Sequence, residues 1–212
     1  MSRMKQVYDH LLEAIVSNQI PPGTPLVETD ISAAMKMSRT PIREALKELE
    51  AEGLVSRYPS RGTIVSHITP YDVEEIFTVR ITLELCALQL SWKKITNCEL
   101  EEVEKLFLTL NSTSSKQDYH HADKMLHSLI INRAGNSRLK KFLNLLNSQI
   151  ERFRRIAADE PTRLTRSKNE HLEIIHFLKE RDLQACEESL KTHLINVKNS
   201  TLDQAKLLAV QL

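Results

Sequence analysis

Two arginines and two hydroxyl side chains lie together in the segment 38–43, whose sequence is Ser-Arg-Thr-Pro-Ile-Arg. Proline suits the first turn of a helix, so the segment predicts a helix that begins at Ser38 or Thr40. A helix N-terminus attracts phosphate through its unbonded N–H groups and its dipole, and both hydroxyls can bond phosphate oxygens. Arg39 and Arg43 are four residues apart, so they share a helix face and can reach base edges, where guanine is the usual target of arginine.

The local charge favours the same chemistry. Residues 1–69 carry eight Lys and Arg against eight Asp and Glu, yet between Lys36 and Arg43 there are three positive side chains and no negative one. Arg61 and Gly62 follow at the tip of an expected hairpin, from which the arginine can reach an adjacent groove of a duplex. A single surface arginine is usually only a solvated charge. The capped helix, the short helix before it and the hairpin after it together favour DNA binding.

Six of the eight histidines follow residue 110. Asp123 and His127 are four residues apart, which places both on one helix face, where they can share a metal ion. His171 and His193 fall at the edges of apolar stripes on two further expected helices. One carboxylate and three imidazoles converging inside a bundle suit a divalent transition metal, with zinc, nickel and manganese as candidates. A histidine on an apolar helix face is more often a hydrogen-bonded core residue, so the spacing alone leaves both interpretations open.

Two kinds of structure must position these residues. In residues 1–69 the apolar spacing predicts a helix over about 3–18, a short helix capped by Thr29, and the basic helix, which Gly53 ends. Two β-prone segments then flank Pro-Ser-Arg-Gly, a plausible hairpin turn. This order of elements is that of a winged helix-turn-helix.

From residue 70 onward the sequence predicts helices alone, about six of them, which form an antiparallel bundle. Thr96 and Glu99 have the spacing of a capping box, and Gly135 is placed to end a helix. We therefore expect a mainly α protein of two domains. Residues 1–69 form the DNA-binding domain, and residues 70–212 form an all-helical domain for effector and metal binding and for dimerisation.

Composition excludes several other classes of protein. Four isolated glycines leave no P-loop and no Gly-x-Gly-x-x-Gly dinucleotide turn. Three scattered cysteines are typical of a reducing compartment and form neither a disulfide framework nor a thiolate zinc site. The first residues lack an apolar leader, and no stretch approaches the ~20 apolar residues of a membrane span, so we expect a cytoplasmic protein without a membrane partner.

A longer motif surrounds the basic helix. Ser-Arg-Thr-Pro-Ile-Arg-Glu-Ala-Leu from residue 38 is followed by Glu-Gly-Leu-Val from residue 52 and Arg-Gly-Thr from residue 61. Over most of residues 5–68 the sequence resembles the GntR family of bacterial transcription regulators. The resemblance implies that the two arginines of the basic helix contact operator bases, that its two hydroxyl side chains contact phosphate, and that the wing around Arg61 and Gly62 enters the minor groove. A pseudo-palindromic operator in double-stranded DNA and a symmetric homodimer are then expected.

A second set of motifs follows the hairpin. Arg80-x3-Glu84, Asp123-x3-His127, Glu170-His171 and the later His193 are similar to the FadR-type C-terminal (FCD) domain, which follows the GntR reader in one large subfamily. The similarity covers about residues 73–205 and implies an antiparallel helical bundle. The metal ligands that it implies are all present: Asp123, His127, His171 and His193. Leu126 stands where an aromatic residue is more usual, outside the ligand set.

The FCD resemblance also implies that the metal helps to hold a small carboxylate effector, an organic or sugar acid. Arg80 is favoured as a second anchor for the anion, because of its positive charge and its place in the motif. An intrahelical ion pair between Arg80 and Glu84 is an equal alternative. Asn132 and Asn136 are weaker candidates for the lining of the pocket.

We therefore expect a ligand-responsive transcriptional regulator, a repressor whose ligand relieves repression, and not an enzyme. Two alternatives remain open at this point. One is a metal-sensing regulator in which the ion itself is the signal. The other is a metal-dependent hydrolase with Glu170 as its general base, which would leave residues 1–68 without a role.

Overall fold

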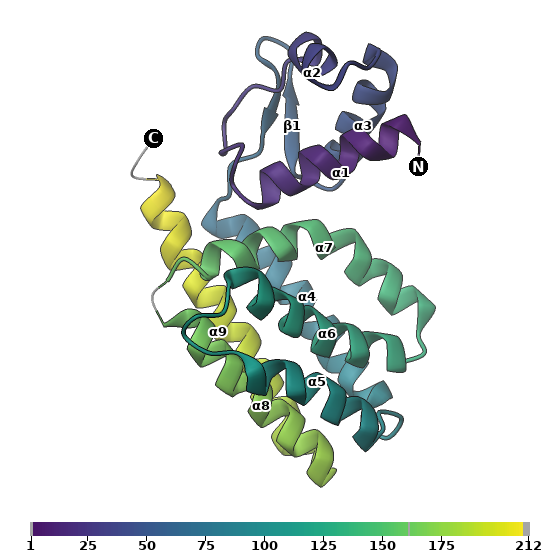
Figure 1. The fold of residues 1–212 in the computed structure, drawn as a ribbon, viewed down its shortest axis with the longest axis vertical. Coiled ribbons are helices and arrows are strands. Elements are labelled where there is room, and N and C mark those ends of the chain that lie inside the picture. The colour runs from purple at the N-terminus through teal and green to yellow at the C-terminus, as the bar shows by residue number, and fades with distance from the viewer. Residues whose placement is uncertain (1, 161, 210–212) are drawn as a thin grey trace. The chain divides into compact units, whose positions relative to one another are not determined.

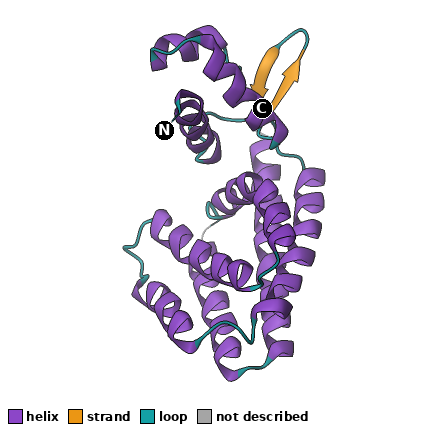
Figure 2. Ribbon diagram, turned by 90° about the vertical axis from the view of Figure 1, so that its right-hand side faces the viewer, coloured by secondary structure: helices purple, strands orange, loops and turns teal. Residues whose placement is uncertain are grey.

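The computed structural model describes residues 2–160 and 162–209, and these form nine helices and one two-stranded sheet. The mainly α fold predicted from the sequence is confirmed (Figures 1 and 2). Contacts between Cα atoms divide the described residues into two compact units: residues 2–69 with 145–152, and residues 70–144 with 153–160 and 162–209. No helix among the described residues is long and apolar enough to cross a membrane.

The first unit contains the expected winged helix-turn-helix elements. They are α1 (Arg3–Val16), α2 (Glu28–Met35), α3 (Arg39–Ala51), β1 (Val55–Tyr58) and β2 (Gly62–Val65). Helix α1 packs on α3, and α2 packs on the same helix. The strands form an antiparallel hairpin in which Tyr58 is paired with Gly62. Figure 2 shows the two strands in orange. One apolar core, with members such as Ile15, Leu46 and Leu54, holds these elements together.

Two boundaries of the first unit have clear local causes. Helix α3 ends at Ala51, and Gly53 follows with a φ of +74°, a left-handed angle that glycine adopts without steric cost. Helix α2 begins two residues earlier than the expected Thr29 cap predicts. Its N-cap is Val27, which accepts the first backbone hydrogen bonds of the helix, and the Thr29 hydroxyl instead contacts Asp30. Acidic side chains in the first turn favour this start through the helix dipole.

The second unit contains the helices of the bundle, which Figure 1 labels. They are α4 (Pro70–Ser91), α5 (Asn97–Thr109), α6 (Lys116–Arg133), α7 (Ser137–Ala157, whose residues 145–152 belong to the first unit), α8 (Arg163–Glu180) and α9 (Leu183–Ala209). Helix α4 packs against α6 and α9, and α8 packs against α5, α6 and α9. Four helices, α4, α6, α8 and α9, therefore meet around a common interior.

Capping and burial fix the bundle locally. The capping box predicted at Thr96 and Glu99 is present at the start of α5, and a second one, between Ser115 and Asp118, starts α6. A single hydrophobic core contains Leu100, Phe107 and other fully buried side chains from these helices. The charged and imidazole side chains described below are buried beside this core.

Candidate functional site

The start of α3 presents its polar side chains outward. Ser38 is the N-cap in an extended conformation, and its hydroxyl makes no capping hydrogen bond to the helix. Ser38, Arg39, Thr40 and Arg43 are exposed, whereas Ile42 is completely buried in the core of the unit. The structure thus places both hydroxyls and both guanidinium groups at the surface of one helix end, where a phosphate or a base edge can reach them.

The two predicted residues of the wing lie at the tip of the hairpin. Arg61 and Gly62 are both exposed, and the backbone N–H of Arg61 donates to the carbonyl of Tyr58 across the turn. Gly62 has a φ of +71°, and a Cβ added there would meet no atom within 4 Å. Glycine is therefore favoured at this position by its backbone angle, not by crowding within the chain.

The four predicted metal ligands converge in the interior of the second unit. Asp123 and His127 come from α6, His171 from α8 and His193 from α9, and one ligand atom of each lies within 4.8 Å of the others. All four residues are buried, and none exposes more than 8% of its surface. The Nε2 atoms of His127 and His171 are 3.4 Å apart, and Nε2 of His171 is 3.2 Å from Oδ1 of Asp123.

The other ring nitrogens are turned outward to polar partners. Nδ1 of His127 contacts Oε2 of Glu84, and Nδ1 of His193 donates to Oε2 of Glu170 at 2.7 Å. The hydroxyl of Ser167 lies 3.4 Å from Nδ1 of His171. Such partners fix the orientation of an imidazole and leave its Nε2 lone pair for a metal, an arrangement that is usual around bound ions.

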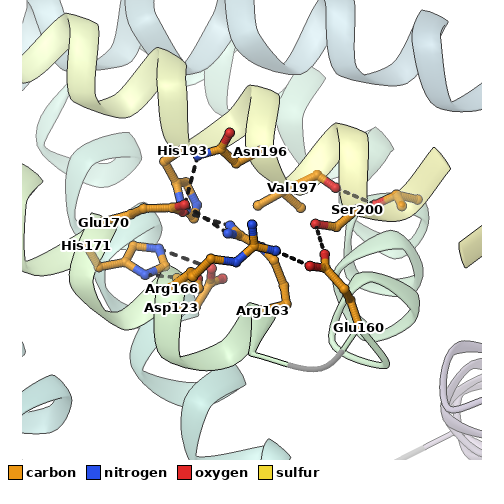
Figure 3. Close-up of polar contacts among 12 residues, drawn as sticks. Asp123, Glu160, Arg163, Arg166, Glu170, His171, His193, Asn196, Val197 and Ser200 are labelled. Atoms are coloured by element: carbon orange, nitrogen blue, oxygen red, sulfur yellow. Dashed lines mark hydrogen bonds and ion pairs between the residues drawn. The ribbon is translucent and has the colours of Figure 1, made fainter. Parts of the chain in front are cut away.

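Figure 3 shows that Glu170 lies at the centre of a network between α8 and α9. Arg163 donates two hydrogen bonds to its carboxylate, at 2.8 and 2.7 Å, and Asn196 donates a third at 2.9 Å. Together with the bond from His193, these contacts occupy both oxygens. Burial alone would raise the pKa of Glu170, but Arg163 and His193 outweigh it and hold the pKa well below its usual range. A carboxylate held in this way orients its neighbours and is a poor general base, which argues against the hydrolase alternative.

The charge states in the cluster suit a metal. Burial, followed by the neighbouring His171, lowers the pKa of His193 well below its usual value, and burial likewise lowers that of His171. Burial opposes the charged form of Asp123, but Arg154 and the adjacent histidines outweigh it and keep the pKa of this carboxyl well below its usual range. Neutral imidazoles and an ionised carboxylate are the forms that bind a cation.

Several atoms of the cluster have no hydrogen-bond partner among the described residues. They include Nε2 of His193 and Oδ2 of Asp123. Nε of Arg154 lies 3.0 Å from that oxygen, as an ion pair whose geometry is not that of a hydrogen bond. A buried polar atom without a partner is costly unless a ligand satisfies it. Three imidazole nitrogens and one carboxylate oxygen are also a suitable donor set, so these residues fit a divalent transition metal.

The structure is compatible with both interpretations of Arg80 that the sequence left open, the ion pair with Glu84 and the anchor for an anion. Its Nε donates to Oε1 of Glu84 at 2.7 Å, so the intrahelical ion pair exists. Its other two nitrogens are buried and have no hydrogen-bond partner among the described residues, and the side chain is completely enclosed. Since a guanidinium group stays charged when it is buried, these N–H groups are suited to bind an anion.

A cavity of about 30 Å³ borders the cluster. Asp123 and His171 form part of its wall, and Arg154, Arg163 and Lys168 bring positive charge to it. The structure does not bring the two predicted asparagines here. Both Asn132 and Asn136 are exposed, and the carboxamide oxygen of Asn136 accepts hydrogen bonds from backbone N–H groups as the N-cap of α7.

Sequence reasoning missed several residues that surround the site. Arg154 and Arg163 were not singled out, because a buried arginine looks like a surface arginine in the sequence. Glu84 was considered only as a partner of Arg80, and Glu170 only as a base, so their contacts with the histidines were not foreseen. We call the exposed residues at the start of α3 and at the hairpin tip the reading surface. Next to it, Glu28 was also overlooked, although it forms an ion pair with Arg43.

Comparison with known proteins identifies the families to which the two parts of the chain are similar. The family model for the FCD domain matches residues 75–196, and the model for bacterial regulatory proteins of the gntR family matches residues 3–65. The HTH-type transcriptional repressor RspR of Escherichia coli (strain K12) is 28% identical over 199 residues, 92% of this chain and 87% of the relative. The HTH-type regulator YdhC of Bacillus subtilis (strain 168) is 27% identical over 195 residues, 89% of this chain and 86% of the relative.

A solved structure extends the likeness to the fold. A GntR-type regulator from Rhodococcus sp. RHA1 has a TM-score of 0.78 at 23% identity, over 96% of this chain and 99% of that one. The matching families and relatives are transcriptional regulators and not enzymes. The chain belongs to the GntR family of bacterial regulatory proteins, as a DNA-binding transcriptional regulator whose winged helix-turn-helix precedes an FCD ligand-binding domain.

Proposed function

We propose that this regulator binds its operator as a homodimer and releases it when a small carboxylate metabolite binds beside a divalent metal ion in the FCD domain. The observation that carries the proposal is the convergence of four buried metal-binding side chains beside buried atoms that make no hydrogen bond. Nε2 of His193 is free to bind a cation, and the two terminal nitrogens of Arg80 are free to bind an anion. The name of one relative, a transcriptional repressor, supports repression as the direction of control.

The reading surface is proposed to contact DNA with two groups of residues. Arg39 and Arg43 reach base edges in the major groove, and the exposed hydroxyls beside them bind phosphate. Arg61 and Gly62 at the wing enter the neighbouring minor groove. Two-fold symmetry of the dimer then requires two half-sites, so the operator is a pseudo-palindrome.

Exposed apolar side chains on α4 support the dimer. Val79 and Leu90 leave 45% and 39% of their surfaces accessible in the single chain. They are eleven residues apart, which places them on the same face of the helix. A cytoplasmic location is proposed with the dimer, because operator DNA is found there.

The metal is proposed to be zinc, with nickel and manganese as the other candidates for the same donors. Asp123, His127, His171 and His193 would hold it, and it would supply a positive charge to which a carboxylate oxygen can bind. Arg80 would hold the anion from the other side. The cavity has room for little more than one water-sized group, so a whole metabolite must displace neighbouring side chains. Such displacement gives the ligand a different affinity for two arrangements of the chain, which allosteric control requires.

The metal can be tested directly on the purified full chain. We expect about one zinc ion per chain by metal analysis after removal of all tags, and loss of that ion in the variant His193→Ala. His176→Ala is the matched control, because His176 is exposed on α8, the helix that carries His171. Equal zinc content in both variants would reject the metal site.

The effector can be sought with a thermal-shift screen of organic and sugar acids, with and without chelator. An acid that raises the melting temperature only when the metal is present, and that weakens operator binding, supports the proposal. The metal-sensing alternative predicts a different result: operator affinity follows the free metal concentration and ignores every acid. The unpartnered nitrogens of Arg80 favour the organic anion, because a site for an ion alone has no use for them.

The reading surface is tested by the double variant Arg39→Ala/Arg43→Ala. We expect it to lose sequence preference, since each bidentate contact to a base contributes about 1–3 kcal/mol of discrimination. Lys105→Ala is the control, because this exposed lysine lies on α5 in the other unit. Unchanged preference in the arginine variant would reject these residues as the readers.

A further inference from the structure

An ion pair connects the reading helix to the first turn of the helix before it. Nε of Arg43 on α3 donates to Oε2 of Glu28 on α2 at 2.6 Å. The side chain of Arg43 is 59% exposed and that of Glu28 is 29% exposed, so the pair lies at the surface of the reading unit. Because Arg43 is one of the two proposed base-reading residues, whatever holds its side chain also sets what it can read.

The geometry of the pair leaves the reading end of the guanidinium in place. An arginine has five N–H donors, and the bond to Glu28 uses the single one on Nε. The two terminal nitrogens remain as a fork, and a fork of this kind matches O6 and N7 of guanine. A long, flexible side chain that is fixed before binding loses less conformational entropy when it reaches the base.

The contact between Glu28 and Arg43 is poorly explained by the stability of the free protein. Ion pairs as exposed as this one contribute little to folding. Glu28 does lie in the first turn of α2, where a negative charge favours the helix dipole, but Asp30 lies in the same turn and supplies the same effect. Of these two carboxylates, Glu28 is the one that forms an ion pair with Arg43.

A carboxylate beside the reading helix also has an electrostatic consequence. DNA carries a negative charge on every phosphate, so Glu28 opposes binding to a duplex of any sequence. A residue that weakens general attraction while it fixes a base-reading side chain increases the difference between the right and the wrong sequence.

We propose that Glu28 is a positioning residue for base recognition: it holds Arg43 with its terminal nitrogens presented to a guanine, and it lowers affinity for unrelated DNA. The inference rests on the proposed reading role of Arg43. It makes two predictions of opposite sign for Glu28→Gln, which keeps the size of the side chain and removes its charge. Base preference falls, while affinity for unrelated duplex rises. A purely structural role would lower both.

The test begins with the full-length wild-type chain, which selects its preferred duplexes from a random-sequence library. Fluorescence anisotropy then gives the Kd for the selected duplex, for its single-base-pair substitutions and for an unrelated duplex. The variants are Glu28→Gln, Arg43→Ala and the matched control Asp30→Asn, which removes a charge from the same helical turn. Circular dichroism and thermal unfolding establish that each variant is folded.

We expect Arg43→Ala to abolish the preference at one base pair in each half-site. Glu28→Gln should reduce the preference at that same base pair by about two- to five-fold, the size expected for an ion pair of this exposure, and leave the other positions unchanged. Asp30→Asn should alter no preference.

The outcomes separate the two claims. If Arg43→Ala flattens a position and Glu28→Gln leaves it intact, the positioning role is overturned and the reading role stands. The same conclusion follows if Glu28→Gln and Asp30→Asn weaken binding to all duplexes equally. If Arg43→Ala flattens no position, both the reading role and the inference from it are overturned.

Discussion

Replacing Glu170 by glutamine keeps the shape of the side chain and removes the charge that four hydrogen bonds share. Arg163 donates two of these bonds, at 2.8 and 2.7 Å, and His193 and Asn196 donate one each, at 2.7 and 2.9 Å. A carboxamide has one accepting oxygen, so Glu170→Gln cannot satisfy all four. We expect His193 to lose the partner that orients its Nε2 toward the proposed metal.

The magnitude follows from this loss. Removing the outer partner of a metal-binding histidine lowers metal affinity by about 10- to 100-fold. At a free zinc concentration about 1,000 times the wild-type Kd, the metal stabilises the wild type by about 4.1 kcal/mol and the variant by about 1.4–2.7 kcal/mol. Since 1 kcal/mol changes the melting temperature of a chain of this size by about 2–4 °C, the rise induced by zinc should be smaller in the variant by about 3–11 °C.

The assay compares each variant with itself, with zinc and with chelator. This comparison removes the separate destabilisation that comes from leaving the buried Arg163 without a charged partner, about 3–5 kcal/mol for a buried pair that loses one member. Glu173→Gln is the control, because Glu173 is exposed on the same helix. A folded Glu170→Gln protein whose zinc-induced rise equals that of the wild type would refute the reasoning.

Three further predictions follow from the described geometry. Burial lowers the pKa of His171 and, with the adjacent imidazole, that of His193, so below about pH 6.5 the unfolded chain binds more protons than the folded one. The free energy of unfolding of the metal-free protein should therefore fall as the pH drops through this value in urea titrations, and a flat profile would contradict the assignment. Burial raises the pKa of Cys186 to about 12, whereas Cys98 is exposed, so iodoacetamide at neutral pH should modify Cys98 first by peptide mass spectrometry; equal rates would count against it. Gly62→Ala should cost about 1–2 kcal/mol in thermal unfolding, from its left-handed backbone angle alone, and a much larger loss would reveal a contact at the hairpin tip.

The sequence predicted the helices and the hairpin well because their signals are local. Gly53 and the capping box at Thr96 ended and began helices as expected. The start of α2 was misplaced, because Thr29 looks like a cap in the sequence while the backbone turns at Val27. The choice between two starts that differ by two residues depends on how the segment packs in three dimensions, which residue type alone does not show.

The same limit applies to the candidate site. Asp123 and His127 are neighbours on one helix, so their spacing predicts their proximity. His171 meets them because α8 packs beside α6, and His193 because α9 packs on α8 and α4. The FCD resemblance supplied what spacing left open. The outer partners were beyond both sources. The contact between Glu84 and His127 joins residues 43 positions apart, and no short motif encodes it.

The two oxygens of Glu84 have different occupants, and this division has a regulatory consequence. Oε1 accepts from Arg80, the proposed anchor of the anion, while Oε2 contacts His127, a proposed ligand of the metal. A shift of this one carboxylate therefore moves a contact of the proposed anion anchor and a contact of the proposed metal ligand together. By thermodynamic linkage, if the bound ion raises the affinity for the metabolite by some factor, the bound metabolite raises the affinity for the ion by the same factor. The dose at which the cell's metabolite begins to act on transcription would then depend on how much of the ion is available, so that one promoter responds to nutrition and metal supply together.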